Sequence, residues 1–146
     1  MIVGTEWLVD AEGCRPELLS DLPAVRATCE RILDDLSLRT IGEGLAHQFP
    51  PPGGVTLMYL LTESHLACHT YPEHGIALFS LSCCRPRPRW DWEGQLRALL
   101  GAERVTVRCL SRGAVAEPEP TVGQVCDLPE EEAGHRPAPR QTATSA

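Results

Sequence analysis

A serine follows a glutamate directly after an apolar run of strand length, at Glu63-Ser64, and this pair carries the most distinctive chemistry in the sequence. A hydroxyl in this position can attack the carbonyl carbon of its own peptide bond instead of an external substrate. His69 lies five residues further on, and two thiols, Cys83 and Cys84, come one further strand later. The spacing therefore indicates chemistry that the chain performs on itself.

Size and composition limit the classes of function. The 146 residues fit one domain, and the hydrophobic content of 42% is that of an ordinary soluble protein. The net charge of −7 argues against a nucleic-acid partner, whose phosphates need clustered Lys and Arg. All 13 cationic side chains are arginine. A pyridoxal-phosphate Schiff base needs a lysine, so a decarboxylase built on this chain needs another electron sink.

The cysteines and the N-terminal residues indicate a cellular compartment. There are seven cysteines, an odd number, and the sequence does not open with a basic and apolar leader. We therefore expect reduced thiols in the cytoplasm, with Cys14, Cys29 and Cys109 serving as small core residues. No stretch approaches the roughly 20 apolar residues that would cross a membrane, so we expect no membrane partner.

Hydrophobic patterns predict strands and helices. Apolar runs or alternation predict five strands, at residues 7–11, 40–49, 55–61, 76–82 and 105–109. Apolar residues at three- and four-residue spacing predict a helix over 18–36, with a possible break at Pro23, and a shorter helix over 92–100. Several strand connections are too short for a parallel crossover. We therefore expect an α+β fold, a two-layer sandwich of a mainly antiparallel sheet with helices on one face.

The uncovered face of this sheet needs a partner, and a second copy of the chain is the simplest one. From about residue 114 the composition changes to Pro, Glu, Gly, Ala and Thr. We therefore expect one domain over 1–113 and a disordered, acidic, Pro-rich tail over 114–146.

Four blocks of sequence resemble the short, prokaryotic type of pyruvoyl-dependent S-adenosylmethionine decarboxylase proenzyme. The resemblance covers roughly residues 4–113, and its blocks appear in order at compatible spacing. They are Gly4-Thr5-Glu6-Trp7 with Gly13-Cys14, then His47-Gln48-Phe49 with Gly54-Val55-Thr56, then Glu63-Ser64-His65-Leu66 with His69-Thr70, Pro72-Glu73 and Gly75, and finally Cys84.

The resemblance implies that the chain cuts itself between Glu63 and Ser64. An acyl shift from nitrogen to oxygen would form an ester, and loss of the Ser64 α-proton would leave a pyruvoyl group made from Ser64. His69 would transfer the proton, since an imidazole titrates near pH 6.5. Thr56 would support processing by stabilising the cyclic intermediate, and Cys84 would be the proton donor in catalysis. Cys83 would point the opposite way along a strand and serve in packing.

The same resemblance implies a substrate and an assembly. The pyruvoyl group would form a Schiff base with S-adenosylmethionine and accept the electrons released with carbon dioxide, giving decarboxylated S-adenosylmethionine for polyamine synthesis. Phe49 and Tyr71 would stack on adenine and favour the sulfonium cation, and Glu73 would accept hydrogen bonds from the ribose. The products of cleavage would be a β chain, 1–63, and an α chain from Ser64, and we expect a homodimer of αβ units.

Other functions remain open at this point. His65 and His69, with Cys68, His74 and the thiol pair nearby, could form a metal site, but their spacing lacks a zinc motif and we expect no metal. Cys84 with His69 could form a nucleophile pair for hydrolysis. A chain that fails to process at Ser64 would be a non-catalytic binding or regulatory relative.

Four departures from the family pattern bear on the substrate. Glu6 stands where a histidine is common, Ser80 where an aspartate is common, and Arg85 replaces a small residue after Cys84. The loop over 50–54 has one extra residue. None of these removes a processing residue, but a changed pocket could prefer ornithine or arginine, whose distal cation would bind a carboxylate such as Glu6 or Glu73.

Overall fold

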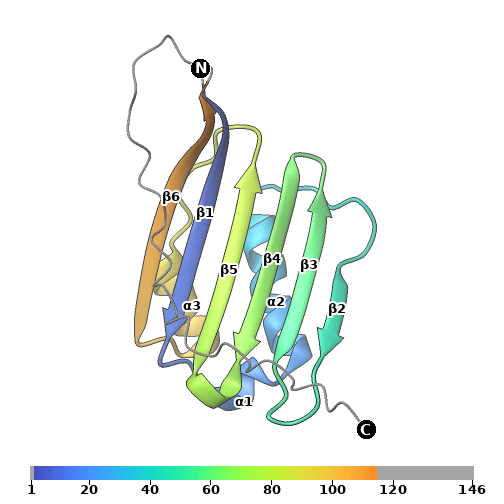
Figure 1. The fold of residues 1–146 in the computed structure, drawn as a ribbon, viewed down its shortest axis with the longest axis vertical. Coiled ribbons are helices and arrows are strands. Elements are labelled where there is room, and N and C mark those ends of the chain that lie inside the picture. Colours follow the sequence, from blue (N-terminus) through green and yellow to red (C-terminus); the bar gives the residue numbers. More distant parts are fainter. Residues whose placement is uncertain (1, 115–146) are drawn as a thin grey trace, which may run out of the picture. The chain divides into compact units, whose positions relative to one another are not determined.

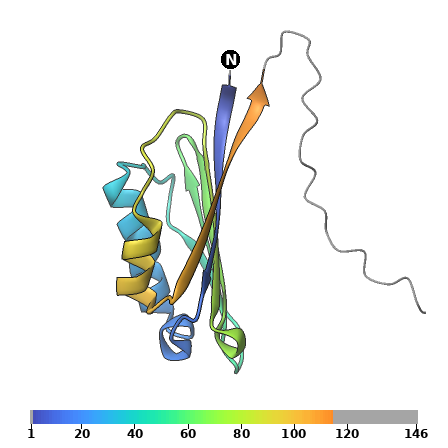
Figure 2. The same cartoon turned by 90° about the vertical axis from the view of Figure 1, so that its left-hand side faces the viewer.

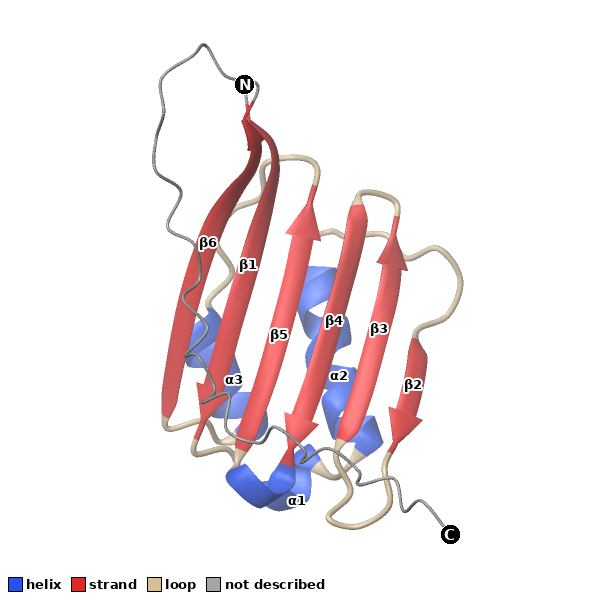
Figure 3. Cartoon of the chain, in the orientation of Figure 1, coloured by secondary structure: helices blue, strands red, loops and turns tan. Residues whose placement is uncertain are grey.

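Residues 2–114 are described by the computed structural model, in which six strands form one antiparallel sheet of order β2-β3-β4-β5-β1-β6 (Figures 1 and 3). The strands are β1 (Ile2–Glu12), β2 (Leu45–Gln48), β3 (Val55–Leu61), β4 (Ser64–Tyr71), β5 (Ile76–Cys83) and β6 (Arg104–Ala114). The helices are α1 (Pro16–Leu19), α2 (Leu22–Asp35) and α3 (Trp92–Leu100), with a 3-10 turn, η1 (Pro72–His74). None of the described helices is long and apolar enough to cross a membrane.

The three helices lie on one face of the sheet, as Figure 2 shows. The core fills the space between the two layers. Leu57, Leu66 and Leu81 from the sheet and Ile32 and Leu96 from the helices are all fully buried in it. The alternation of buried and open residues along β3 and β5 follows from the two-residue period of a strand. The predicted α+β sandwich with a mainly antiparallel sheet and helices on one face is therefore confirmed.

Most of the predicted elements are present. Two strands differ in length from the prediction, one because of its pairing with neighbouring strands and one because of a glycine. The strand predicted over 7–11 is longer, Ile2–Glu12, because β1 pairs with both β5 and β6. The strand predicted over 40–49 shortens to Leu45–Gln48. Gly42 has a positive φ of 72°, and the residues before it make only an isolated bridge between Thr40 and Leu61.

The predicted long helix is two helices, and its break comes before Pro23 rather than at it. The first helix ends at Leu19, and Pro23 occupies the first turn of α2, where its missing N–H has no helical partner to lose.

The expectation that Cys109 is a core residue is wrong. Val105 and Val107 of the edge strand β6 pack against the core, but Cys109 lies further along this strand and is exposed. Cys14 and Cys29 are buried, as predicted.

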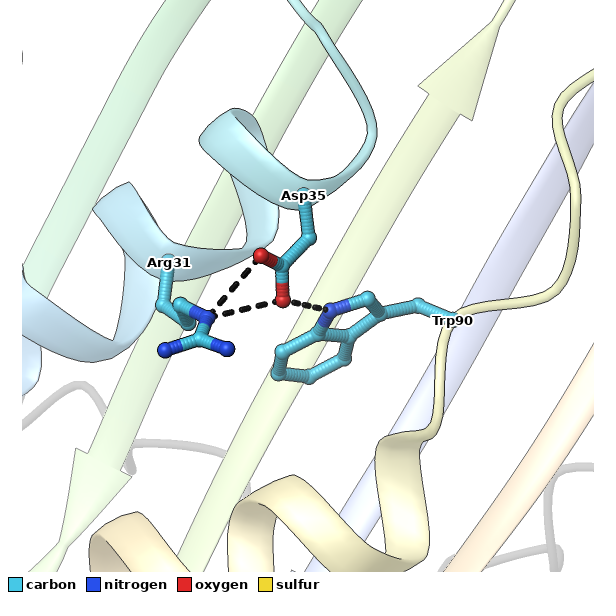
Figure 4. A network of polar contacts seen from close by, with 3 residues as sticks. All are labelled: Arg31, Asp35 and Trp90. Atoms are coloured by element: carbon cyan, nitrogen blue, oxygen red, sulfur yellow. Dashed lines mark hydrogen bonds and ion pairs between the residues drawn. The ribbon is translucent and has the colours of Figure 1, made fainter.

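A polar contact fastens the segment between β5 and α3 to the helical layer. The indole Nε1 of Trp90 donates a 2.8 Å hydrogen bond to Asp35 Oδ2 of α2, and Arg31 binds the same carboxylate (Figure 4). Trp90 is buried, and its ring packs edge-on against Trp92 at 5.0 Å between centroids. The loop that follows Cys84 therefore ends at a fixed point.

Candidate active site

The Glu63-Ser64 bond lies in the tight turn between β3 and β4. Leu61 pairs with Ser64, so Thr62 and Glu63 are the two turn residues. Two-residue hairpins favour turns with a positive φ in their central residues. Among the described non-glycine residues only Ser37 and Ser64 have a positive φ, so neither turn residue has one. The unusual conformation falls on Ser64, whose φ is 153°, in a region that is almost confined to glycine.

This backbone conformation brings the Ser64 side chain toward the bond that precedes it. Substituents on Cα are about 120° apart, so a φ of 153° leaves Cβ only about 30° from eclipsing the Glu63 carbonyl carbon. Attack of Oγ on that carbon closes a five-membered ring, which needs a small torsion of this kind. In an ordinary strand Cβ is turned well away from the carbonyl carbon. The strain at Ser64 therefore favours the geometry of an acyl shift.

The residue that follows β5 and the second residue of β4 contact the Glu63-Ser64 pair. The backbone N–H of Cys84 donates a 3.1 Å hydrogen bond to the Glu63 carbonyl oxygen, the atom that would carry charge during attack. Ser64 Oγ lies 3.2 Å from His65 Nδ1, close enough to exchange a proton.

The two adjacent thiols have opposite environments. Cys83 pairs with Ser64 in the sheet and is buried, which raises the pKa of its thiol, so the expectation that it packs in the interior is confirmed. Cys84 is exposed, and its thiol is free.

A second group of predicted residues lies at the other end of β3 and β4. A cavity of about 420 Å³ is lined by Phe49, Thr56, His69, Tyr71 and Glu73, together with Thr70 and residues of the loop that precedes β3. Thr56 lies opposite His69, and its Oγ1 is 3.1 Å from His69 Nδ1. Phe49 and Tyr71 are 49% and 40% exposed, which excludes ordinary core packing within the chain. All five residues therefore present side chains to one hollow.

Close backbone packing shapes this cavity. A Cβ placed on Gly54 would lie 2.4 Å from the Thr70 carbonyl oxygen, so only glycine fits there. The buried Thr70 hydroxyl accepts a 2.8 Å hydrogen bond from the Val55 N–H and donates one of 2.8 Å to Leu19 O. These contacts fix the start of β3 against β4 and so set where Thr56 meets His69.

One chain does not bring the two groups together. Five residues of strand separate Ser64 from His69, which corresponds to about 16 Å, and the two ends of β4 are far apart in Figure 1. His69 therefore cannot reach Ser64 of its own chain, and the pair of Cys84 with His69 is divided in the same way. His65 and His69 are likewise four strand residues apart, and the described residues contain no group of three or more His, Cys, Asp or Glu that could hold a metal ion.

Two contacts in the serine group were not foreseen from the sequence. Adjacent strand residues normally point to opposite faces, so nothing indicated the contact between Ser64 and His65. Arg87 forms an ion pair with the Glu63 side chain from an irregular loop 24 residues away. No sequence pattern marks that pair.

Known proteins are similar to this chain in sequence and in fold. A family model described as S-adenosylmethionine decarboxylase matches residues 5–113. The chain therefore belongs to the S-adenosylmethionine decarboxylase family.

Individual relatives cover most of the chain. An S-adenosylmethionine decarboxylase proenzyme of Syntrophomonas wolfei is 32% identical over 121 residues, covering 80% of this chain and 92% of the relative. One from Pelotomaculum thermopropionicum is 31% identical over 130 residues, covering 86% and 98%. The crystal structure of the adenosylmethionine decarboxylase from Aquifex aeolicus VF5 matches with a TM-score of 0.65 at 25% identity, covering 82% of this chain and 98% of that one.

Proposed function

We propose that this chain is a proenzyme that cuts itself at Glu63-Ser64 and then decarboxylates S-adenosylmethionine. Its relatives bear the name S-adenosylmethionine decarboxylase proenzyme, which supports both the reaction and a processing step. The observation that carries the proposal is the φ of 153° at Ser64, which turns the serine side chain toward the carbonyl carbon of Glu63. A strained residue persists only where its surroundings enforce it, and such residues cluster at functional sites.

Processing proceeds in three balanced steps. Ser64 Oγ attacks the Glu63 carbonyl carbon, the peptide C–N bond breaks, and the hydroxyl proton, passed through His65, ends on the freed amine. The product is an ester. Loss of the Ser64 α-proton then breaks the Cβ–Oγ bond and releases Glu63 as a carboxylate. The dehydroalanine left behind takes up water and releases ammonia, so that residue 64 becomes a pyruvoyl group.

The base for the α-proton comes from a second copy of the chain. His69 is a suitable base, and Thr56 beside it offers a hydroxyl, but both lie about 16 Å from Ser64 of their own chain. No described element covers the sheet face opposite the helices (Figure 2). Met58 and Leu60, which alternate with buried residues of β3, are exposed on that face. Two copies that cover these faces around a twofold axis place His69 of one beside Ser64 of the other.

The residues around Ser64 fit a pyruvoyl group and the chemistry that follows. The ketone of that group would supply the electron sink for decarboxylation in a chain that has no lysine to hold pyridoxal phosphate. Cys84, which is exposed next to the strand position paired with Ser64, returns a proton to the substrate α-carbon. The raised pKa of buried Cys83 keeps its thiol protonated and out of the reaction.

The cavity at the other end of β4 suits the adenosyl part of the substrate. Its 420 Å³ falls in the range of about 300–1,000 Å³ typical of ligand sites. Phe49 and Tyr71 provide exposed aromatic faces for adenine and for the sulfonium cation, and Glu73 accepts hydrogen bonds from the ribose. Glu6, by contrast, is engaged by Arg112 and is not a free carboxylate for the distal cation of ornithine or arginine.

Intact mass spectrometry of the purified protein under denaturing, reducing conditions tests the proposal. We expect two fragments divided between Glu63 and Ser64, the C-terminal one lighter than its sequence by one ammonia. Release of carbon dioxide from S-adenosylmethionine, compared with ornithine and arginine, then tests the substrate. The Ser64→Ala chain is the control and should remain whole and inactive. A wild-type chain that remains whole would contradict the proposal and indicate a binding or regulatory relative.

A further inference from the structure

We propose that Arg87 is a positioning residue for self-cleavage, which holds Glu63 in place for attack. The inference rests on the proposed function and adds a residue to it. Arg87 touches none of the atoms whose bonds change. Its role is to fix the acyl half of the reacting peptide.

The ion pair between Arg87 and Glu63 differs from the others in the described part of the chain. Its side chains are only 22% and 17% exposed, whereas the arginines of the other ion pairs are 48–73% exposed. Exposed pairs of that kind contribute little, but a pair screened from water holds its partners more firmly, and removal of one partner leaves a buried charge. Among the ion pairs of the described residues, this is the one whose arginine is largely shielded from water, and its partner is the residue whose peptide bond is to break.

Glu63 is held at two points by the same loop. The Cys84 N–H binds its carbonyl oxygen at 3.1 Å, and Arg87, three residues later, binds its carboxylate. The far end of this loop is fixed by the buried Trp90 and its hydrogen bond to Asp35 (Figure 4). These contacts therefore hold the carbonyl carbon of Glu63 in place and keep Ser64 in its strained conformation.

The ion pair has unused hydrogen-bonding capacity on both sides. Glu63 Oε2 and Arg87 Nε are both buried, and neither has a hydrogen-bond partner among the described residues, although buried polar groups are normally satisfied. Guanidinium groups bind carboxylates through two parallel hydrogen bonds. The vacant donor and acceptor therefore suit a second hydrogen bond between the same two side chains, which would tighten the hold of Arg87 on Glu63.

The experiment follows cleavage after cell-free synthesis, sampled over time by denaturing mass spectrometry. We expect Arg87→Met to slow the appearance of the two fragments by about tenfold or more, as removal of one sheltered charged hydrogen bond predicts. Arg87→Lys keeps the charge and should recover part of the rate. Arg89→Met is the matched control, because Arg89 lies on the same loop in an exposed pair with Glu93, and it should process like wild type.

Two further measurements separate positioning from loss of fold. Glu63→Gln keeps the size of the side chain but removes its charge. It should slow cleavage as Arg87→Met does, while the chain keeps its native circular dichroism spectrum and still melts cooperatively. Hydroxylamine cleaves esters and not amides. We expect it to release no extra fragment from Arg87→Met, because the block comes before the ester forms. Extra release would mean that Arg87 acts after the acyl shift and would overturn the inference.

The failure of this inference differs from the failure of the proposed function. Wild-type rates in both Arg87→Met and Glu63→Gln overturn the role of Arg87 and leave self-cleavage standing. A wild-type chain that is never cut overturns both.

Discussion

The separation of Ser64 from His69 along one strand leads to a test by mixing two defective chains. Ser64→Ala removes the proposed nucleophile, and His69→Ala removes the proposed base at the other end of β4. If each site combines Ser64 of one chain with His69 of its partner, neither variant alone forms a complete site. A dimer with one chain of each kind contains one complete site and one doubly defective site. Co-expression should therefore restore cleavage that both variants lack.

The arrangement fixes the size of the effect. With equal amounts and random pairing, about half of the dimers are mixed, and one chain in each mixed dimer is cut. About a quarter of all chains should then be processed, or about half of those that carry Ser64. If His69 instead served Ser64 of its own chain, across about 16 Å, the mixture would process no better than the separate variants.

Distinct affinity tags on the two chains permit the measurement. Mixed dimers are isolated through both tags, and the fragments of each chain are identified by mass. Only the His69→Ala chain should be cut, and decarboxylase activity should appear only in the doubly tagged fraction. A doubly tagged fraction that remains whole would refute the shared site, and the control is a co-expression of two tagged wild-type chains.

Three other predictions concern stability and thiol chemistry. Trp90→Phe should lower the free energy of unfolding by about 1 kcal/mol, measured with urea, because the hydrogen bond to Asp35 is lost. Hydrogen bonds from Arg31 and, to a smaller extent, from Trp90 lower the pKa of Asp35 in the folded chain. The stability that the Asp35 carboxylate contributes is therefore complete above the pKa of this group in the unfolded chain, and it is lost as the pH falls through the pKa in the folded chain. Thermal melts should show the wild type losing its stability advantage over Asp35→Asn in acid, and an advantage that stays constant with pH would contradict this. In brief alkylation of the Ser64→Ala chain at neutral pH, peptide mapping should show modified Cys84 and unmodified Cys83, since burial raises the pKa of the latter.

The chain's local patterns were sufficient to predict the layers of the fold. The apolar run of β3 and the amphipathic α3 were predicted with the bounds that the structure has, because burial dictates both patterns. The strand predicted over 40–49 was too long, because the apolar residues before β2 suggested a strand where Gly42 turns the chain. The prediction that Cys109 is a core residue failed for another reason. Alternation tells which face a residue occupies, but not whether a helix reaches far enough to cover it.

Part of the site could be predicted, because the turn between β3 and β4 sets the register in which these two strands pair. Once Thr62 and Glu63 form a two-residue turn, pairing along the ladder sets Thr56 opposite His69, and the strand itself separates His69 from Ser64. The strain at Ser64 and the ion pair of Arg87 could not be predicted in this way. Both depend on how an irregular loop, anchored at Trp90, packs against a turn that is distant in the sequence.

The order of strands has a consequence for the protein after the proposed cleavage at Glu63-Ser64. The N-terminal fragment supplies β1, β2 and β3, and the C-terminal fragment supplies β4, β5 and β6, yet β1 lies between β5 and β6. The fragments are thus interleaved, and neither can leave without dismantling the sheet. Folding of the intact chain is a first-order process, whereas refolding after the cut requires an encounter of two molecules and depends on their concentration. The native sheet must therefore form before cleavage. A processed molecule that unfolds regains this sheet far more slowly in dilute solution.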